Sequence, residues 1–340
     1  MKALLIGGTG TISMAITRQL IREGWDLTLL NRGNRTAELP EGVKVITADI
    51  SDEAETAARL AGQNFDVAAD FIAFAPEQAQ RDVRLFSGKV SQYLFISTAS
   101  AYHKPARNWL INEGTPLANP YWAYSRNKIA CEDALMRAYR EEGFPVTIVR
   151  PSHTYDERKL PVGVHGKKGS WQVARRILDG KPVIIHGDGS SLWTLTFNTD
   201  FARGFVGLMG NPHAIGEAFQ ITSDEALTWD QIYGELACAL GRELKAVHVP
   251  SEFLAEVGPQ YDYRGALLGD KMGVAVFDNG KLKRAVPGFQ ATVRYDQGVR
   301  RAVQHILAHP ELQIEDPEFD AWCDRVIAAL DQAKSAILGG

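Results

Sequence analysis

The glycine-rich turn near the start of the chain constrains the fold most, because it joins an apolar run to a helical pattern. Residues 2–6 form a short run that is apolar apart from Lys2, GGTGTIS follows, and apolar residues at helical spacing come next. Strand, glycine turn and helix are the context that a dinucleotide-binding fingerprint requires. Gly7 permits the tight turn, Gly10 lets backbone amides approach a pyrophosphate at the helix N-terminus, and Ser13 is small enough for close packing. The cofactor contacts expected here are Gly7, Gly10, Thr11 and Ile12.

Further apolar runs alternate with helical segments over the first 150 residues. The strands expected from these runs are residues 27–30, 43–46, 65–73, 93–96 and 146–149. This alternation predicts an α/β fold with a doubly wound parallel sheet, which binds ligands outside the carboxyl ends of its strands. The residues expected at that edge are Phe71, Ile72, Ala73, Pro151 and His153.

The end of the second predicted strand bears on the choice of cofactor. An acidic residue there would bind the 2′-hydroxyl of NAD and repel a 2′-phosphate. This chain has Asn31, followed by Arg32 and Arg35. NAD(P) is therefore the expected cofactor, with NADP favoured, although arginines in a solvated loop would give the same pattern. Asp49 and Ile50, after the third strand, are expected to frame the adenine.

The segment NPYWAYSRNK predicts a helix that carries an acid/base pair. Asn119 is a good N-cap residue, Pro120 suits the first helical position, and Gly143 ends the apolar pattern. Tyr124 and Lys128 lie four residues apart and share one face of this helix. A nearby ammonium stabilises a phenolate and lowers its pKa, so the pair can donate and accept a proton.

A second Tyr-x-x-x-Lys match occurs at Tyr155 and Lys159. It directly follows a predicted strand, and Pro161 comes soon after, so one helix is not expected to carry both side chains. We interpret this second match as accidental. Spacing alone would also allow the first pair to be an ordinary packed tyrosine and a solvated lysine.

Composition limits the classes of function. The chain has 340 residues, 45% hydrophobic and 23% charged, with a net charge of −4 and three cysteines. No basic stripe, transmembrane-length run or metal-ligand spacing appears in it. We expect a cytoplasmic protein without a metal, nucleic-acid partner or membrane surface.

Several motifs together resemble the extended short-chain dehydrogenase/reductases of the NAD(P)-dependent epimerase/dehydratase family. The motifs are GGTGTIS, FISTASAY, YSRNK, VRPSHTY, GDGSSLW, NTDFARGF and FDNGKLKRAVPGF, and the resemblance spans about residues 1 to 305. It implies that Tyr124 is the acid/base, that Lys128 holds the nicotinamide ribose, and that Thr98 orients the substrate oxygen. Thr98 lies four positions before Tyr102, and Tyr124 follows it by 124 − 98 = 26 residues, the interval of the family. The resemblance also implies a homodimer, through the Tyr124 helix and the helix near residues 78–86.

Two departures from the family pattern concern the substrate. Ala99 and Ser100 follow Thr98 where dehydratases carry an acidic residue, so sugar dehydration is not expected. Trp193 occupies the position of an Arg that grips the diphosphate of nucleotide sugars, which favours a smaller sugar, sugar acid or sugar phosphate. The residues expected to contact substrate are Ser100, His153, His165, Lys167 and Trp193. For the loop with His165 and Lys167, a solvated basic loop is the open alternative.

The expected domain organisation is a nucleotide-binding domain followed by a substrate lobe. Residues 1–151 form the first domain, and 189–222 return to it; the lobe takes 152–188 and 223–310, and 311–340 form a last helix. The expected function is NAD(P)-dependent oxidation, reduction or epimerisation at a secondary alcohol of a small, carbohydrate-like molecule. The alternative is a non-catalytic nucleotide-sensing or RNA-binding protein of the same fold.

Overall fold

The computed structural model describes residues 1–33 and 39–339, and the chain divides into two compact units. Unit 1 comprises Met1–Thr154, Thr196–Asp224 and Phe277–Thr292, and unit 2 comprises Tyr155–Leu195, Glu225–Val276 and Val293–Gly340. Residues 189–195 therefore lie in unit 2 and 277–292 in unit 1, whereas the predicted boundaries placed them the other way round. The second difference arises because Leu282 and Phe289 belong to the core beneath the unit 1 sheet.

Unit 1 is built on a parallel sheet, which has seven strands within the described residues. The strands in spatial order are β3 (Lys44–Thr47), β2 (Asp26–Asn31), β1 (Lys2–Ile6), β4 (Phe65–Asp70), β5 (Val90–Ile96), β7 (Val146–Pro151) and β12 (Ala218–Ile221). The order reverses between β1 and β4, so the glycine turn after β1 opens at the point where a doubly wound sheet leaves a crevice.

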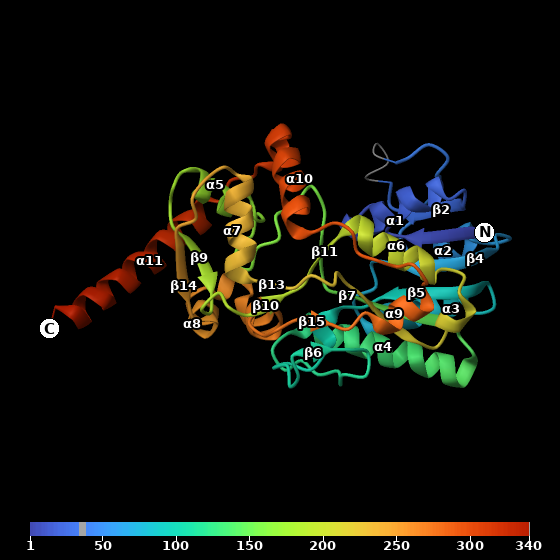
Figure 1. Ribbon diagram of the computed structural model, residues 1–340. Coiled ribbons are helices and arrows are strands. Elements are labelled where there is room, and N and C mark those ends of the chain that lie inside the picture. Colours follow the sequence, from blue (N-terminus) through green and yellow to red (C-terminus); the bar gives the residue numbers. More distant parts are fainter. Residues whose placement is uncertain (34–38, 340) are drawn as a thin grey trace. The chain divides into compact units, whose positions relative to one another are not determined.

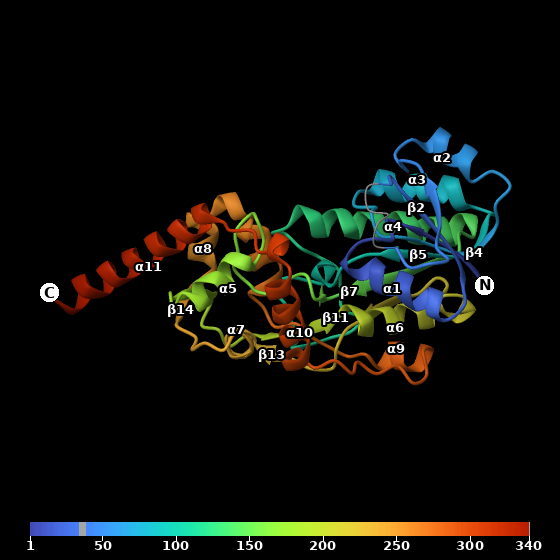
Figure 2. The same ribbon diagram turned by 90° about the horizontal axis from the view of Figure 1, so that it is seen from above.

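Helices cover both faces of this sheet (Figures 1 and 2). On one side lie α1 (Thr11–Arg22), α6 (Asn198–Leu208) and α9 (Gly280–Ala285). On the other side lie α2 (Glu53–Arg59), α3 (Pro76–Phe86) and α4 (Ala123–Glu142). Ala3 and Leu5 pack in the core under α1 and α6, whereas Leu4 and Ile6 pack in the core under α3 and α4. A strand buried on both faces must be apolar throughout, which explains the continuous apolar runs. The predicted doubly wound parallel sheet is confirmed.

Two predicted elements differ from the structure. The run 65–73 forms a strand only as far as Asp70, because the Asp70 carboxylate accepts hydrogen bonds from the amides of Ile72 and Ala73 and turns the chain. Residues 195–197 were expected to return to the main sheet, but β11 (Leu195–Phe197) pairs with β8 (His153–Tyr155) instead. The strand that completes the sheet is β12, beside β7.

The start of α4 also differs, because Asn119 does not cap it. The helix begins at Ala123, after Trp122, and ends as predicted at Gly143 with a left-handed φ of 72°. Asn119 is buried, and its side chain donates to the Ser100 carbonyl and accepts from the amides of Tyr121 and Trp122. The side chain thus orders the turn before the helix and ties it to the segment after β5.

Unit 2 is smaller and mixes helices with short strand pairs. The pairs are β9 (Val183–His186) with β14 (Ala246–Val249) and β10 (Leu192–Trp193) with β13 (Leu227–Thr228). The helices are α5 (Trp171–Leu178), α7 (Trp229–Ala239), α8 (Ser251–Val257), α10 (Tyr295–Ala308), α11 (Pro317–Leu338) and a π-helix over Arg264–Lys271.

The remaining elements of the two units are short. They are β6 (Leu110–Ile111), paired with β15 (Val276–Phe277), and 3-10 turns at Ala99–Ala101, Pro212–Ala214, Pro259–Tyr261 and Pro310–Leu312. Among the described residues, no helix combines the length and apolar character needed to span a membrane.

We expect a buried histidine to make unit 2 sensitive to acid. His186 is 1% exposed, its ring centroid lies 4.7 Å from that of Trp229, and its Nε2 lies 3.1 Å from the Lys271 carbonyl oxygen. Burial lowers the pKa of His186 from 6.5 to about 4. Because the folded pKa lies below the unfolded value, this group's contribution to stability is complete above about pH 6.5. It is lost as the pH falls through the folded pKa near 4.

We expect His186→Gln to flatten the acid limb of the stability curve, because Gln keeps an N–H donor and does not titrate. The largest effect of the wild-type ring is about 3 kcal/mol of unfolding free energy, the value of a shift of this size. Urea unfolding at a series of pH values from 7 down to 4 measures it. The exposed His213 in unit 1, changed to Gln, is the matched control. Parallel pH curves for wild type and His186→Gln would contradict the prediction.

Candidate active site

The glycine turn between β1 and α1 is held by the side chain of Ser13. Its hydroxyl donates to the Gly7 carbonyl and accepts from the Gly10 amide, both at 2.8 Å. Gly7 has a φ of +80°, and a Cβ there would lie 2.6 Å from the Ile72 side chain. A Cβ on Gly10 would meet only the Ser13 hydroxyl, at 3.4 Å, so the protein leaves space above this residue. The turn can therefore admit a ligand at the N-terminus of α1.

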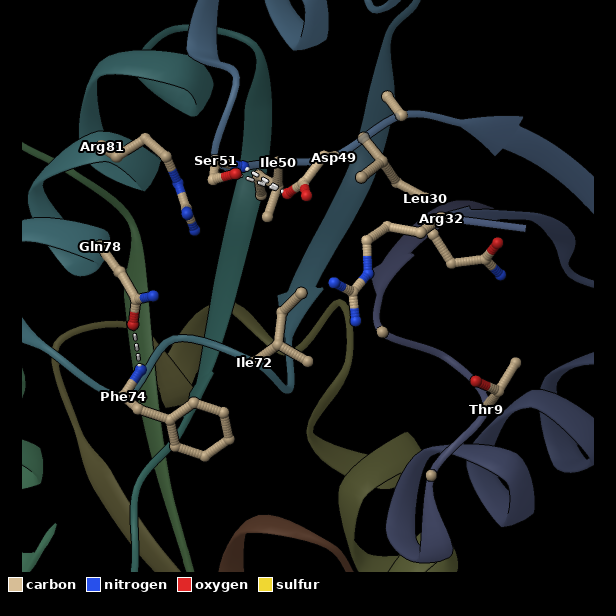
Figure 3. Close-up of a pocket in the computed structure, with 14 residues that line it drawn as sticks. Thr9, Leu30, Arg32, Asp49, Ile50, Ser51, Ile72, Phe74, Gln78 and Arg81 are labelled. Carbon is tan, nitrogen blue, oxygen red and sulfur yellow. Dashed lines mark hydrogen bonds between the residues drawn. The ribbon is translucent and has the colours of Figure 1, made fainter. Parts of the chain in front are cut away.

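A pocket of about 540 Å³ opens beside this turn (Figure 3). Its lining consists of Gly7, Thr9, Gly10, Leu30, Asn31, Arg32, Ala48, Asp49, Ile50, Ser51, Ile72, Phe74, Gln78 and Arg81. These residues come from the carboxyl ends of β1, β2, β3 and β4 and from α3, which is the predicted edge of the sheet. The size and the open glycine turn suit part of a dinucleotide.

Half of the lining was predicted from sequence and half was not. The predicted members are Gly7, Gly10, Asn31, Arg32, Asp49, Ile50 and Ile72. The members that sequence reasoning missed are Thr9, Leu30, Ala48, Ser51, Phe74, Gln78 and Arg81. The first four of these are neighbours of predicted residues, so the spacing of strand ends could have found them. Gln78 and Arg81 lie three residues apart on α3, a spacing that puts both on one helical face.

Other predicted cofactor residues do not line this pocket. They are Thr11, Ile12, Phe71, Ala73, Tyr124, Lys128, Pro151 and His153, while Arg35 lies outside the described residues. Phe71 is half-buried, and its ring packs against Phe205 of α6 at 5.7 Å between centroids. Ala73 is 1% exposed, and its carbonyl oxygen accepts a hydrogen bond from the Lys128 ammonium.

Polar groups order the end of the pocket near β2 and β3. Asp49 accepts hydrogen bonds from the Ser51 hydroxyl at 2.7 Å and from the Ser51 amide at 3.0 Å. These bonds, aided by the charge of Arg32, lower the pKa of the Asp49 carboxyl, which stays ionised at neutral pH. Asn31 accepts from the Gly33 amide at 2.9 Å and so shapes the turn that carries Arg32.

Lys128 lies on α4 next to this pocket and is almost fully buried, with 1% exposure. Its ammonium donates to the carbonyl oxygens of Ala73 and Ile96, both at 2.7 Å. Burial lowers the pKa of Lys128 to about 8. An ammonium has three N–H groups, so two structural bonds leave one for a ligand.

Tyr124 lies one helical turn before Lys128 on the same face of α4. Its ring centroid is 4.9 Å from that of Trp122 and 6.4 Å from that of Phe74, which lines the pocket. Phe74 also covers the Lys128 ammonium, at 4.6 Å from its ring centroid. The predicted Tyr/Lys pair therefore lies next to Phe74, a residue of the pocket lining, and not in the lining itself.

Thr98 follows β5 and is connected to α4 through a chain of hydroxyls. Its Oγ1 lies 2.9 Å from the Ser100 hydroxyl, which lies 2.7 Å from the hydroxyl of Ser125, the neighbour of Tyr124. Ser100 was predicted to contact substrate, but it is 3% exposed and occupied by these bonds. It therefore orients Thr98, and the prediction of a substrate contact is corrected.

The predicted substrate residues of unit 2 are not equally available. Trp193 is 3% exposed, and its ring centroid lies 5.3 Å from that of Trp229, so the expectation of a free face for a sugar ring is wrong. Lys167 is exposed, and the His165 carbonyl accepts from the Tyr263 hydroxyl at 2.9 Å. His153 begins β8, just beyond the carboxyl end of β7 in unit 1.

Known proteins similar to this chain share both sequence and fold. Residues 81–222 match the NAD dependent epimerase/dehydratase family. The chain is 26% identical over 290 residues to 2′-dehydrokanamycin reductase of Streptomyces kanamyceticus, covering 85% of this chain and 80% of that protein. It is 25% identical over 267 residues to the chloroplast stem-loop binding protein of 41 kDa b of Arabidopsis thaliana, covering 74% and 67%. The Thermus thermophilus UDP-glucose 4-epimerase complex with NAD has a TM-score of 0.71 at 20% identity, covering 91% of this chain and 100% of that one, a likeness of fold.

Proposed function

We propose that this chain, whose residues 81–222 match the NAD dependent epimerase/dehydratase family, is an NAD(P)-dependent oxidoreductase or epimerase. Its substrate would be a secondary alcohol, or the matching ketone, of a carbohydrate-like molecule. The observation that carries the proposal is the buried Lys128 ammonium. It stands one helical turn from Tyr124 and beside Phe74, which lines a pocket suited to part of a dinucleotide. A buried cation next to a phenol is the arrangement that general acid/base chemistry at a carbinol oxygen needs.

Each residue of the site has a part in the proposed mechanism. When bound, the nicotinamide supplies or accepts hydride at the carbon that carries the substrate oxygen. Tyr124 gives a proton to that oxygen, or takes it, and the nearby positive charge of Lys128 stabilises the phenolate. The Thr98 hydroxyl, held by Ser100, donates a hydrogen bond to the same oxygen. The remaining N–H of Lys128 would bind the nicotinamide ribose. Epimerisation and net oxidation or reduction use the same groups.

The test of this function is turnover with a defined panel of substrates. The purified protein is mixed with NADPH or NADH and keto sugars, or with NADP or NAD and free sugars, sugar acids and sugar phosphates. Nicotinamide absorbance reports net oxidation or reduction, and proton NMR of the sugars reports epimerisation. Failure of both nicotinamides to bind would reject the proposal.

A nucleotide sugar is the second candidate substrate. The T. thermophilus protein of the same fold is by name a UDP-glucose 4-epimerase, whereas the S. kanamyceticus relative is by name a reductase of 2′-dehydrokanamycin. Trp193 carries no charge for a diphosphate, which favours the smaller substrates. UDP-, GDP- and dTDP-sugars therefore belong in the panel, and saturable stabilisation with turnover by any of them would favour this second candidate.

An RNA-binding role is the alternative from another class. The similarity to a chloroplast stem-loop binding protein favours it. The net charge of −4 disfavours it, since phosphate backbones are bound by clustered positive charge. Stem-loop RNA binding at physiological salt, together with no turnover of the panel, would support this alternative. Pairing of two copies through α3 and α4 stays a prediction.

We expect NADPH to bind more tightly than NADH. Asn31 places no carboxylate at the end of β2, and Arg32 lines the pocket, where its guanidinium can pair with a 2′-phosphate. Arg32→Ala should weaken NADPH binding about tenfold, on the order of one charged hydrogen bond, and change NADH binding little. Calorimetric titration of both cofactors measures this.

Asn31→Asp should reverse the preference, since a carboxylate repels the 2′-phosphate and accepts from a ribose hydroxyl. The control is Arg84→Ala, which removes an exposed arginine that pairs with Glu53 on α2. Tighter binding of NADH by the wild type, or no effect of Arg32→Ala, would show that the arginines of this turn are merely solvated.

A further inference from the structure

Phe74 is an aromatic side chain that remains half-exposed in the wall of the pocket, with 47% exposure. It lies between β4 and α3, where its amide donates to the Gln78 side chain at 2.6 Å (Figure 3). The same Gln78 oxygen accepts from the Ala75 amide at 3.0 Å. The first turn of α3 thus fixes the backbone of Phe74, although the ring itself is only partly covered.

The face of this ring is directed at the Lys128 ammonium, 4.6 Å from the ring centroid. The ring of Phe95 lies on the ammonium as well, at 4.8 Å. With the carbonyl oxygens of Ala73 and Ile96, the two rings make a cage for the charge. Phe95 is fully buried in β5, so Phe74 is the wall of the cage on the side of the pocket.

No ion pair to Lys128 is found within the described residues. The charged or titratable groups that face it are Asp70 on β4 and Cys131 and Glu132 on α4. Asp70 is engaged by Arg81 and by the amides of residues 72 and 73. Glu132 accepts from both Arg150 and Ser97. The negative charges nearby raise the pKa of Lys128 from a distance. The groups in direct contact with the ammonium are aromatic faces and carbonyl dipoles, which attract a cation most strongly when water is excluded.

We propose that Phe74 is a positioning residue for the reaction, one that holds Lys128 in its charged form beside the cofactor. The proposal rests on the proposed role of Lys128 in cofactor binding. Burial works against the charge, since it lowers the pKa of Lys128 to about 8, close to the working range of most proteins. A contact that raises this pKa even slightly decides how much of the protein can bind a cofactor at neutral to alkaline pH.

The first experiment needs no cofactor. The ammonium of Lys128 is titrated by NMR in protein with ¹³C-labelled lysine, and its signal is assigned by its absence in Lys128→Met. We expect Phe74→Leu, which keeps an apolar side chain but no π face, to lower the pKa by ~0.5–1 unit. Phe74→Trp should keep or raise it. Phe253→Leu is the matched control, since Phe253 of α8 is also partly exposed, at 37%, but belongs neither to the pocket lining nor to the cage.

The second experiment measures the affinity for NADPH at pH 6.5 and pH 9 in the same proteins. At pH 6.5, Lys128 should be charged in both the wild type and Phe74→Leu, so their affinities should be similar. Between pH 6.5 and pH 9, the NADPH affinity of Phe74→Leu should fall about three- to tenfold more than that of the wild type. An unchanged Lys128 pKa in Phe74→Leu, or an equal fall in Phe74→Trp, overturns the proposal. If the wild type binds no nicotinamide cofactor, the proposed function fails, while the NMR titration still decides the role of Phe74.

Discussion

Tyr124→Phe is expected to lower turnover by at least about a hundredfold, the usual contribution of a positioned acid/base. The change removes only the phenolic oxygen. The ring keeps its contacts with Trp122 and Phe74, so the free energy of unfolding and the affinity for the cofactor should stay near those of wild type. Turnover of a substrate found in the panel, thermal unfolding and NADPH titration measure the three quantities.

The chain supplies its own control in the second Tyr-x-x-x-Lys match. Tyr155 is 2% exposed and packs against Tyr295 in unit 2, with ring centroids 5.9 Å apart. Tyr155→Phe should leave turnover unchanged. A Tyr124→Phe protein with wild-type turnover would mean that another group moves the proton, and the proposed mechanism would fail.

Lys128→Met is expected to reduce both turnover and cofactor affinity. Met fills a similar volume without a charge, so the phenol of Tyr124 loses its stabilising cation, and a bound ribose loses a donor. The carbonyl oxygens of Ala73 and Ile96 also lose their partner. Turnover should fall by about a hundredfold or more, and the dissociation constant of NADPH should rise about tenfold.

The exposed Lys159, changed to Met, is the matched control for the loss of a lysine. The pH dependence adds a second check. With a Lys128 pKa of about 8, wild-type cofactor affinity should hold below this pH and decline above it. In Lys128→Met this decline should be absent. Equal affinity and turnover in the variant and wild type would assign Lys128 a purely structural role.

Local sequence determined the order of elements and the two motifs of the site. Alternation of apolar runs with helical patterns depends on neighbouring residues, so the parallel sheet could be derived without coordinates. The same holds for the glycine turn, because the positive φ at residue 7 favours glycine over residues with a side chain. It also holds for the spacing of Tyr124 and Lys128 on one helix. These features depend on contacts within a few residues along the chain.

Tertiary structure decided which side chains are free to meet a ligand. Trp193 looked available in sequence but is buried against Trp229, which follows it by 229 − 193 = 36 residues. Asn119 had the chemistry of a helix cap, yet it bonds to the Ser100 carbonyl and leaves the helix to begin later. Phe74 carried no motif, but it covers a lysine 54 residues away (128 − 74). Burial and partners depend on contacts that form only when distant segments pack, and no local pattern encodes them.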